Sequence, residues 1–248
     1  MPLFACFAFL YLPIVVLVVM SFNDARSPFT WGGASLRWYG ELFGDVEIAR
    51  SLGNTMIVAT GATVIATVLG TLVAVGLARH TRSNSLAAFT MAPAILPDLV
   101  LAVGLLVLYS QLQVTLGLAS VLVAHSVFGM AFVTAVVRAR LTQLDPSLEE
   151  ASRDLGATAV TTFLRITLPS LAPAVVAGAL LTFTLSLDEF VIAFFTNGPT
   201  TPTLPITVYS MVRFGVTPEI NALAALLLLV SFTVVIAAAR ITRRTDRS

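Results

Sequence analysis

The sequence predicts an all-α, polytopic membrane protein with six transmembrane helices, for two reasons. Of the 248 residues, 57% are hydrophobic and only 11% are charged, whereas a soluble domain carries about 25% charged residues. The apolar residues also gather in long runs, and a helix needs about 20 such residues to cross a hydrocarbon core of ~30 Å. Because the runs follow one another with short polar connections, we expect a single transmembrane domain over residues 1–248.

Six apolar runs are the candidate spans. They cover residues 3–22, 54–78, 86–109, 116–137, 171–196 and 222–239, and a loop covers about 141–170. The first run has no basic residue before it and no obvious small-residue cleavage site, so we interpret it as a retained span and not a signal peptide. The second is rich in Thr, Gly and Ala, which allow helices to pack closely. Pro93, Pro97 and Asp98 interrupt the third.

Arginine is distributed unevenly between the connections. Ten arginines lie in 79–82, 138–165 and 240–247, and four lie in 23–53 and 197–221. Basic residues concentrate on the cytoplasmic side of membrane proteins. The count therefore predicts that both termini and the 141–170 loop are cytoplasmic.

The 141–170 loop has the pattern of a short amphipathic helix between two spans. Ser147 and Glu150 have the spacing of a capping box at a helix start. Leu148, Ala151 and Leu155 repeat at helical spacing on one face. Gly156 then supplies either a C-terminal cap or room for close approach.

The spacing within this loop is that of a known signature. Glu150-Ala151-Ser152, three residues, Gly156, nine residues and then Ile166-x-Leu168-Pro169 resembles the cytoplasmic signature loop of ABC importer permeases. Ser152 stands where that family usually has a second Ala. The resemblance implies a type I ABC importer permease fold and contact with an ATPase subunit. The residues implied at that coupling contact are Glu150, Ala151, Gly156, Ile166, Leu168 and Pro169. The alternative is an ordinary loop whose charges are solvated.

Three carboxylates lie within the predicted spans, at Asp98, Asp188 and Glu189. A carboxylate near the bilayer centre costs about 2.5 kcal/mol or more, so such groups usually face a cavity or a partner. A straight helix would place Asp98 about 18 Å and Asp188 about 25 Å from the inner surface. No arginine lies inside the predicted spans to neutralise these carboxylates. They therefore indicate a path for a cationic solute. The alternative is a set of structural polar groups, and which carboxylate faces the path stays open.

Other polar and aromatic residues allow two interpretations each. His125 fits an interhelical hydrogen bond better than a metal ligand, because no further ligands accompany it. Trp38 and Tyr39 suit either a cation-contacting surface on the substrate path or an interfacial aromatic belt. The single cysteine, Cys6, excludes a disulfide framework. The sequence also lacks a Gly-rich phosphate loop for ATP.

A narrower resemblance covers nearly the whole chain. Residues 21–24, 31–43, 92–109, 124–133, 183–199 and 203–228 resemble the permeases of bacterial spermidine/putrescine importers. This implies a second permease subunit, two ATPase subunits, an extracytoplasmic solute-binding protein and alternating access. It implies no cofactor on this chain, with ATP and Mg on the ATPase, no nucleic acid, and a place in the bacterial inner membrane. Asp98, Asp188 and Glu189 are then candidate polyamine contacts, and Trp38, chosen for its aromatic face, is a further candidate on the substrate path.

Several alternatives share part of this pattern. Permeases for ferric iron, phosphonates or opines have the same signature loop, so the loop alone does not name the solute. An ion-coupled secondary transporter would often show internal repeats, which we do not find, and would leave the loop without a role. A structural scaffold would leave the carboxylates unexplained. We therefore expect an importer permease that performs no covalent chemistry and is not an enzyme.

Overall fold

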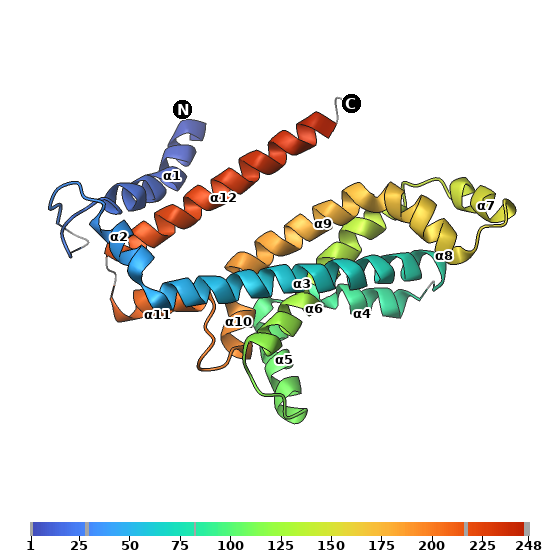
Figure 1. Cartoon of the computed structure of the whole chain (residues 1–248), viewed down its shortest axis with the longest axis horizontal. Helices are drawn as coiled ribbons and strands as arrows, with labels where there is room; N and C mark the ends of the chain where they lie inside the picture. Colours follow the sequence, from blue (N-terminus) through green and yellow to red (C-terminus); the bar gives the residue numbers. More distant parts are fainter. Residues whose placement is uncertain (1, 28–29, 82, 216–217, 246–248) are drawn as a thin grey trace. The chain divides into compact units, whose positions relative to one another are not determined.

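The computed structural model describes residues 2–27, 30–81, 83–215 and 218–245, and these residues are almost entirely helical (Figure 1). The helices are α1 (Pro2–Met20), α2 (Arg37–Gly44), α3 (Val46–Arg79), α4 (Asn84–Ile95), α5 (Asp98–Gln111), α6 (Leu118–Leu141), α7 (Ser147–Asp154), α8 (Ala159–Thr162), the π-helical η1 (Phe163–Thr167), α9 (Leu168–Asp188), α10 (Val191–Thr196), α11 (Leu204–Phe214) and α12 (Pro218–Thr245). Within these ranges β-pairing is limited to one isolated β-bridge, between Asn23 and Ala34. The predicted all-α class is confirmed.

Apolar helices long enough to cross a membrane are fewer than the six predicted spans. Among the described residues, three stretches qualify by length and composition: α3, α6 and the continuous run Ala159–Asp188. Helices α4 and α5 qualify together as a broken span, bent by 109°. Shorter apolar stretches lie at Cys6–Met20 and Pro218–Val230. The count of six therefore stays a prediction, and two arginines of the charge count, Arg82 and Arg247, lie outside the described residues.

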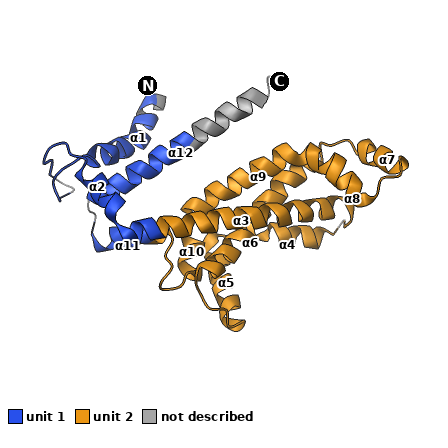
Figure 2. Cartoon of the chain, viewed as in Figure 1, with its two compact units in different colours: residues 1–50, 207–248 blue, residues 51–206 orange. Residues whose placement is uncertain are grey.

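The chain divides into two compact units, residues 1–50 with 207–248 and residues 51–206 (Figure 2). In the first unit, α12 packs against α1 and α2. Helix α2 buries Trp38 and Leu42, and the Trp38 Nε1 donates to the Asn23 carbonyl at 2.7 Å. The Asn23 side chain in turn donates to the Thr30 carbonyl at 2.7 Å and accepts from the Gly32 amide at 2.8 Å. The 23–53 connection thus contains a short helix.

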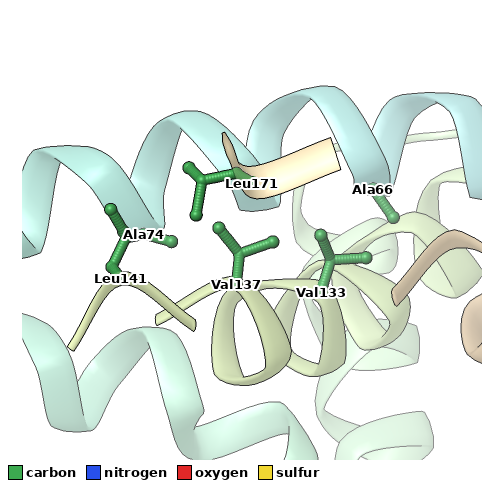
Figure 3. Packing of buried hydrophobic residues seen from close by; sticks show 6 residues of the cluster. All are labelled: Ala66, Ala74, Val133, Val137, Leu141 and Leu171. Atoms are coloured by element: carbon green, nitrogen blue, oxygen red, sulfur yellow. The ribbon is translucent and has the colours of Figure 1, made fainter. Parts of the chain in front are cut away.

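The second unit is organised around α6. Val133, Val137 and Leu141 of α6 form a fully buried apolar cluster, shown in Figure 3. Ala66 and Ala74 of α3 and Leu171 of α9 complete the cluster. Since α3 and α9 both contribute to one cluster with α6, these three long helices share a single core.

Small residues bring these helices close together. A Cβ atom at Gly70 of α3 would lie 2.8 Å from the Val133 Cβ, and one at Gly178 of α9 would lie 3.3 Å from the Val133 Cα. A Cβ at Gly129 of α6 would clash with the Thr182 side chain. Hydroxyls bridge the same crossing, since Thr182 donates to the Gly129 carbonyl at 3.3 Å. The close packing predicted from the Gly- and Thr-rich run at 54–78 is confirmed at Gly70.

Two of the predicted spans contain a break. Leu96 between α4 and α5 is extended, with ψ of 143°, because a residue before proline is pushed out of the helical region. The second break follows Asp188, where Glu189 is extended with ψ of 110°. Helices α5 and α10, which begin after the breaks, pack together, with Ile192 in a cluster with Ala102 and Leu105. Residues 86–109 and 171–196 are therefore not continuous helices.

We predict that Gly129→Ala destabilises the protein by about 1–3 kcal/mol, the usual cost of overpacking a close helix crossing. The matched control is Gly104→Ala on α5, where a Cβ would meet nothing within 4 Å. That change should be neutral or stabilising by up to about 1 kcal/mol, since Ala favours a helix over Gly. The thermal midpoint of the purified protein in detergent measures both effects. Equal midpoints for the two variants would contradict the close α6–α9 packing.

Candidate functional site

The loop helix α7 begins at Ser147, one residue before the start that the predicted Ser147 cap implies, and its cap differs from the prediction. The Asp145 side chain accepts a hydrogen bond from the Ser147 amide at 2.9 Å. This bond lowers the pKa of Asp145. Ser147 is already inside the helix. The residue before it, Pro146, is the N-cap and makes no side-chain capping hydrogen bond. The predicted capping box of Ser147 and Glu150 is therefore wrong. The Asp-Pro pair explains the difference, because an Asp readily bonds the backbone two residues on and proline suits a helix start.

Gly156 ends α7 through its backbone conformation. Its φ is +86°, a region that residues with a Cβ rarely adopt. The Gly156 amide donates to the Arg153 carbonyl at 2.8 Å, and the Ala157 amide donates to the Ser152 carbonyl at 3.1 Å. These two bonds form a Schellman cap. A Cβ at Gly156 would meet nothing within 4 Å, so of the two roles predicted for this glycine, the cap is the one present in this chain.

Glu149 anchors α7 to the long helices. It is buried, with 8% of its surface exposed, and its carboxylate lies 3.1 Å from Arg79 at the end of α3 and 3.6 Å from Arg153. Thr167, at the base of α9, donates to the same carboxylate at 3.0 Å. Sequence reasoning chose Glu150 and missed Glu149. The available signal was the spacing of four between Glu149 and Arg153, which allows an ion pair within one helical turn.

The face of α7 that points away from Glu149 is exposed to solvent in this chain. Glu150 and Ala151 are exposed, and Leu148 and Leu155 are 53% and 90% exposed. We call the apolar residues Leu148, Ala151 and Leu155 the loop face. A face of this kind on a monomer usually marks contact with another protein.

The rest of the signature lies in the helix that leads back to the membrane core. Ile166 is half-buried in η1, Leu168 is half-buried at the start of α9, and Pro169 is exposed. Helix α8, η1 and α9 form one continuous helical run from Ala159 to Asp188. Proline has no amide hydrogen and crowds the carbonyl four residues earlier. The wider π turn directly before Pro169 is consistent with this constraint.

The three carboxylates predicted on the substrate path gather at the two helix breaks. Asp98 is the first residue of α5, Asp188 is the last residue of α9, and both are exposed. Glu189 follows directly and is buried, with 9% of its surface exposed, and it interacts electrostatically with both aspartates. The depths calculated for a straight helix do not apply to Asp98, because α4 and α5 are bent by 109°.

The two oxygens of Glu189 differ in their environment. Oε1 accepts a hydrogen bond from the Ile192 amide at 2.9 Å, in the first turn of α10. Oε2 is buried and has no hydrogen-bond donor among the described residues. A buried acceptor without a donor is costly. Glu189 therefore combines a structural role at one oxygen with an open acceptor at the other.

Trp38 belongs to the first unit, and its indole is buried and bonded to Asn23. The Arg37 guanidinium carbon lies 4.9 Å from the ring centroid, so a cation already covers part of the ring. Its role on the substrate path stays a prediction.

His125 lies at the α6–α9 crossing, where the interhelical hydrogen bond predicted for it is confirmed. Its Nδ1 is 2.7 Å from the Ser186 Oγ. Within the described ranges, no group of three or more His, Cys, Asp or Glu residues has the arrangement of a metal site.

Comparison with known proteins connects these features to one family. Residues 66–247 match the family described as "Binding-protein-dependent transport system inner membrane component". The chain belongs to this family. It is 45% identical over 231 residues to the putrescine transport system permease protein PotI of Escherichia coli (strain K12), which covers 90% of this chain and 82% of that protein. It is 39% identical over 241 residues to the spermidine/putrescine transport system permease protein PotC of the same strain, covering 96% and 91%.

Solved structures share the fold at low sequence identity. A bacterial ABC transporter involved in the import of the acidic polysaccharide alginate aligns with a TM-score of 0.74 at 15% identity, covering 96% of this chain and 93% of that one. The inward-facing MetNI methionine ABC transporter aligns with a TM-score of 0.62 at 22% identity, covering 79% and 93%. The type I ABC importer permease fold predicted from the signature loop is confirmed.

Membership of this family defines the general role of the chain. It is an inner membrane component of a transport system that depends on a binding protein. Both relatives are named permease proteins, and a permease subunit is not itself an enzyme. As an ABC importer permease it works with an ATPase and a binding protein.

We predict that Glu149→Ala loosens α7, because removing one partner of a buried ion pair costs about 3 kcal/mol or more. Limited trypsin digestion of the purified chain should then cut after Arg153 several-fold faster than in the wild type. Glu150→Ala is the matched control, since Glu150 is exposed, and its cleavage rate should stay unchanged. If both variants are cut at the wild-type rate, Glu149 does not anchor the loop.

Proposed function

We propose that this chain is a permease subunit of an ATP-driven importer of polyamines such as putrescine and spermidine. The observation that carries the proposal is the cluster of Asp98, Asp188 and Glu189 at two helix breaks, with an open acceptor at the Glu189 Oε2. The relatives named above, a putrescine permease and a spermidine/putrescine permease, support the choice of solute.

The chemistry of the solute matches this cluster. A polyamine carries primary ammonium groups, and each is a compact cation with three hydrogen-bond donors. An ammonium next to Glu189 would supply the donor that Oε2 lacks while Asp98 and Asp188 add attraction. The exposure of both aspartates limits that attraction, because water screens charges in accessible sites. Weak binding suits a transport path, since a tightly held solute would not be released.

Transport in this proposal follows alternating access in a larger assembly. A solute-binding protein delivers the polyamine from outside, and this chain pairs with a second permease subunit. Two ATPase subunits bind ATP and Mg, so this chain binds no cofactor of its own. The loop face of α7, with Glu150 and Gly156 beside it, would seat against one ATPase.

The orientation of the chain in the bacterial inner membrane is part of the proposal. The positive-inside rule applied to the arginine count supports cytoplasmic placement of both termini and of the signature loop. The same placement brings the loop face to the compartment that holds ATP.

We predict that the Asp98→Asn, Asp188→Asn double variant lowers polyamine uptake by roughly tenfold or more, since an ion pair at close range contributes about 1–4 kcal/mol. Glu189→Gln should also lower uptake, because the amide keeps an oxygen for the Ile192 amide but replaces the open acceptor with a donor. Uptake of labelled putrescine or spermidine is measured in cells without other polyamine importers.

The control for these variants is Glu47→Gln, which removes an exposed carboxylate in the first turn of α3. Co-purification of the partner subunits verifies that each variant assembles. If the double variant assembles and transports polyamine at the wild-type rate, the two aspartates are structural. The carboxylate site would then give no support to a polyamine as the transported solute.

We predict that Gly156→Val abolishes ATP-driven uptake while the chain stays in the membrane. A β-branched residue at φ of +86° is strained, at a cost of about 1–3 kcal/mol, so the Schellman cap should open and displace the loop face. Ala159→Val is the matched control, an exposed position three residues on in α8. Uptake and ATPase activity of the assembled complex are the measurements. Normal uptake by the Gly156 variant would contradict the coupling role of the loop.

A further inference from the structure

A cavity of about 340 Å³ lies where the end of α3, the start of α4 and the end of α6 meet. It is distinct from the carboxylate cluster and from the loop face. Its polar and charged lining residues are Arg79, Thr81, Ser83, Asn84, Arg138 and Thr142. Among the described residues that line the cavity, both charged ones are arginines and none is a carboxylate.

The two arginines differ in how far their guanidinium groups are already paired. Arg79 uses its Nε for Glu149, but its Nη2 is buried without an acceptor among the described residues. Arg138 is half-buried in the last turn of α6, and within the described part of the chain it has no ion pair. A buried guanidinium nitrogen without an acceptor carries a desolvation cost. Because the Arg79 Nη2 is closed to solvent, Arg138 is the arginine through which an anion from outside would bind.

The start of α4 adds to the positive character of the cavity. Asn84 is the first residue of this helix of 12 residues, and the Ser83 side chain caps it by accepting from the Leu86 amide at 3.3 Å. The amides of a first helical turn and the helix dipole favour an anion. Two arginines and a helix start therefore converge on one cavity.

Apolar residues form the remaining walls. Leu77, Ala78, Ala87 and Leu141 line the cavity. The cavity also lies at the ends of α3 and α6, two helices long and apolar enough to cross the membrane. The ends of membrane-spanning helices are where lipid headgroups meet the chains of the bilayer. A small hydrated anion would gain nothing from these walls, whereas a phospholipid would place its phosphate at the arginines and its glycerol and upper chains against them.

We propose that this cavity binds the phosphate of an anionic phospholipid in the leaflet on the arginine-rich side of the membrane. Guanidinium and phosphate form charge-assisted, often bidentate hydrogen bonds. Basic pockets between membrane helices are typical sites for anionic headgroups. The proposal is independent of the transported solute, since it uses none of the carboxylates.

Native mass spectrometry of the assembled transport complex, titrated with phosphatidylglycerol, tests the proposal. Arg138→Gln should weaken phosphatidylglycerol binding by roughly tenfold, the value of one charge-assisted hydrogen bond. Arg140→Gln is the matched control, because Arg140 is exposed on the same helix, contacts Gln143 and does not line the cavity. It should leave binding unchanged.

A second pair of variants tests the cavity without changing its charge. Ala87→Leu would fill the space between the walls and should reduce phosphatidylglycerol binding, whereas Ala88→Leu, at an exposed neighbouring position outside the cavity, should not. Phosphatidylcholine carries the same phosphate but balances it with a choline cation, so it should bind the wild-type complex more weakly and show a smaller difference between the Arg138 and Arg140 variants.

Three results would overturn the proposal. The first is equal phosphatidylglycerol binding by the Arg138 and Arg140 variants. The second is competition by inorganic phosphate as effective as that by the lipid, which would make the cavity a site for a free anion. The third is loss of ATPase co-purification in the Arg138 variant with unchanged lipid binding, which would make it a protein contact.

Discussion

The close packing of α6 against α3 and α9 is the constraint on which the second unit depends. Apolar side chains gain little from burial against each other when the alternative is lipid, so membrane helices associate through close contact and hydrogen bonds. Gly70 and Gly129 supply the contact, because a Cβ at either would meet the facing helix. The Thr182 hydroxyl donates to the Gly129 carbonyl at 3.3 Å, and the Thr134 hydroxyl, 2.7 Å from the Met130 carbonyl, also lies 3.2 Å from the Gly70 carbonyl. Substituting one glycine would thus disturb both the packing and the adjacent hydrogen bond.

The two helix breaks are possible because this core holds the flanking segments in place. A broken helix in a bilayer is tolerated only where protein or a water-filled cavity satisfies its free backbone groups. Glu189 meets part of that need by accepting from the Ile192 amide, and Asp98 stands in the first turn of α5, where a negative charge is favourable. The carboxylates are therefore structural and electrostatic at once. The sequence allowed these carboxylates to be either structural groups or part of a path for cations. For Glu189, Oε1 fits the structural interpretation, and Oε2 is the oxygen to which the proposed cationic path refers.

The sequence predicted the helical class, the membrane character and the signature loop, because each depends on composition or on local spacing. Residues that act through distant partners were harder to predict. Glu149 was missed, since its partners Arg79 and Thr167 are separated from it by 70 and 18 positions. Its exposed neighbour Glu150 fitted the family pattern instead. The break after Asp188 was also missed, because no proline or glycine stands there, whereas Pro97 marked the other break.

The loop and the carboxylate cluster lie at opposite ends of one helix. Thr167 bonds to Glu149 at the base of α9, and α9 ends at Asp188, next to Glu189. Its 21 residues span about 30 Å at a rise of 1.5 Å per residue. Leu171 near one end and Thr182 near the other both pack on α6, so α9 is held along its length. Helix α9, packed on α6 along its length, is therefore the direct connection between the anchor of α7 and the carboxylates.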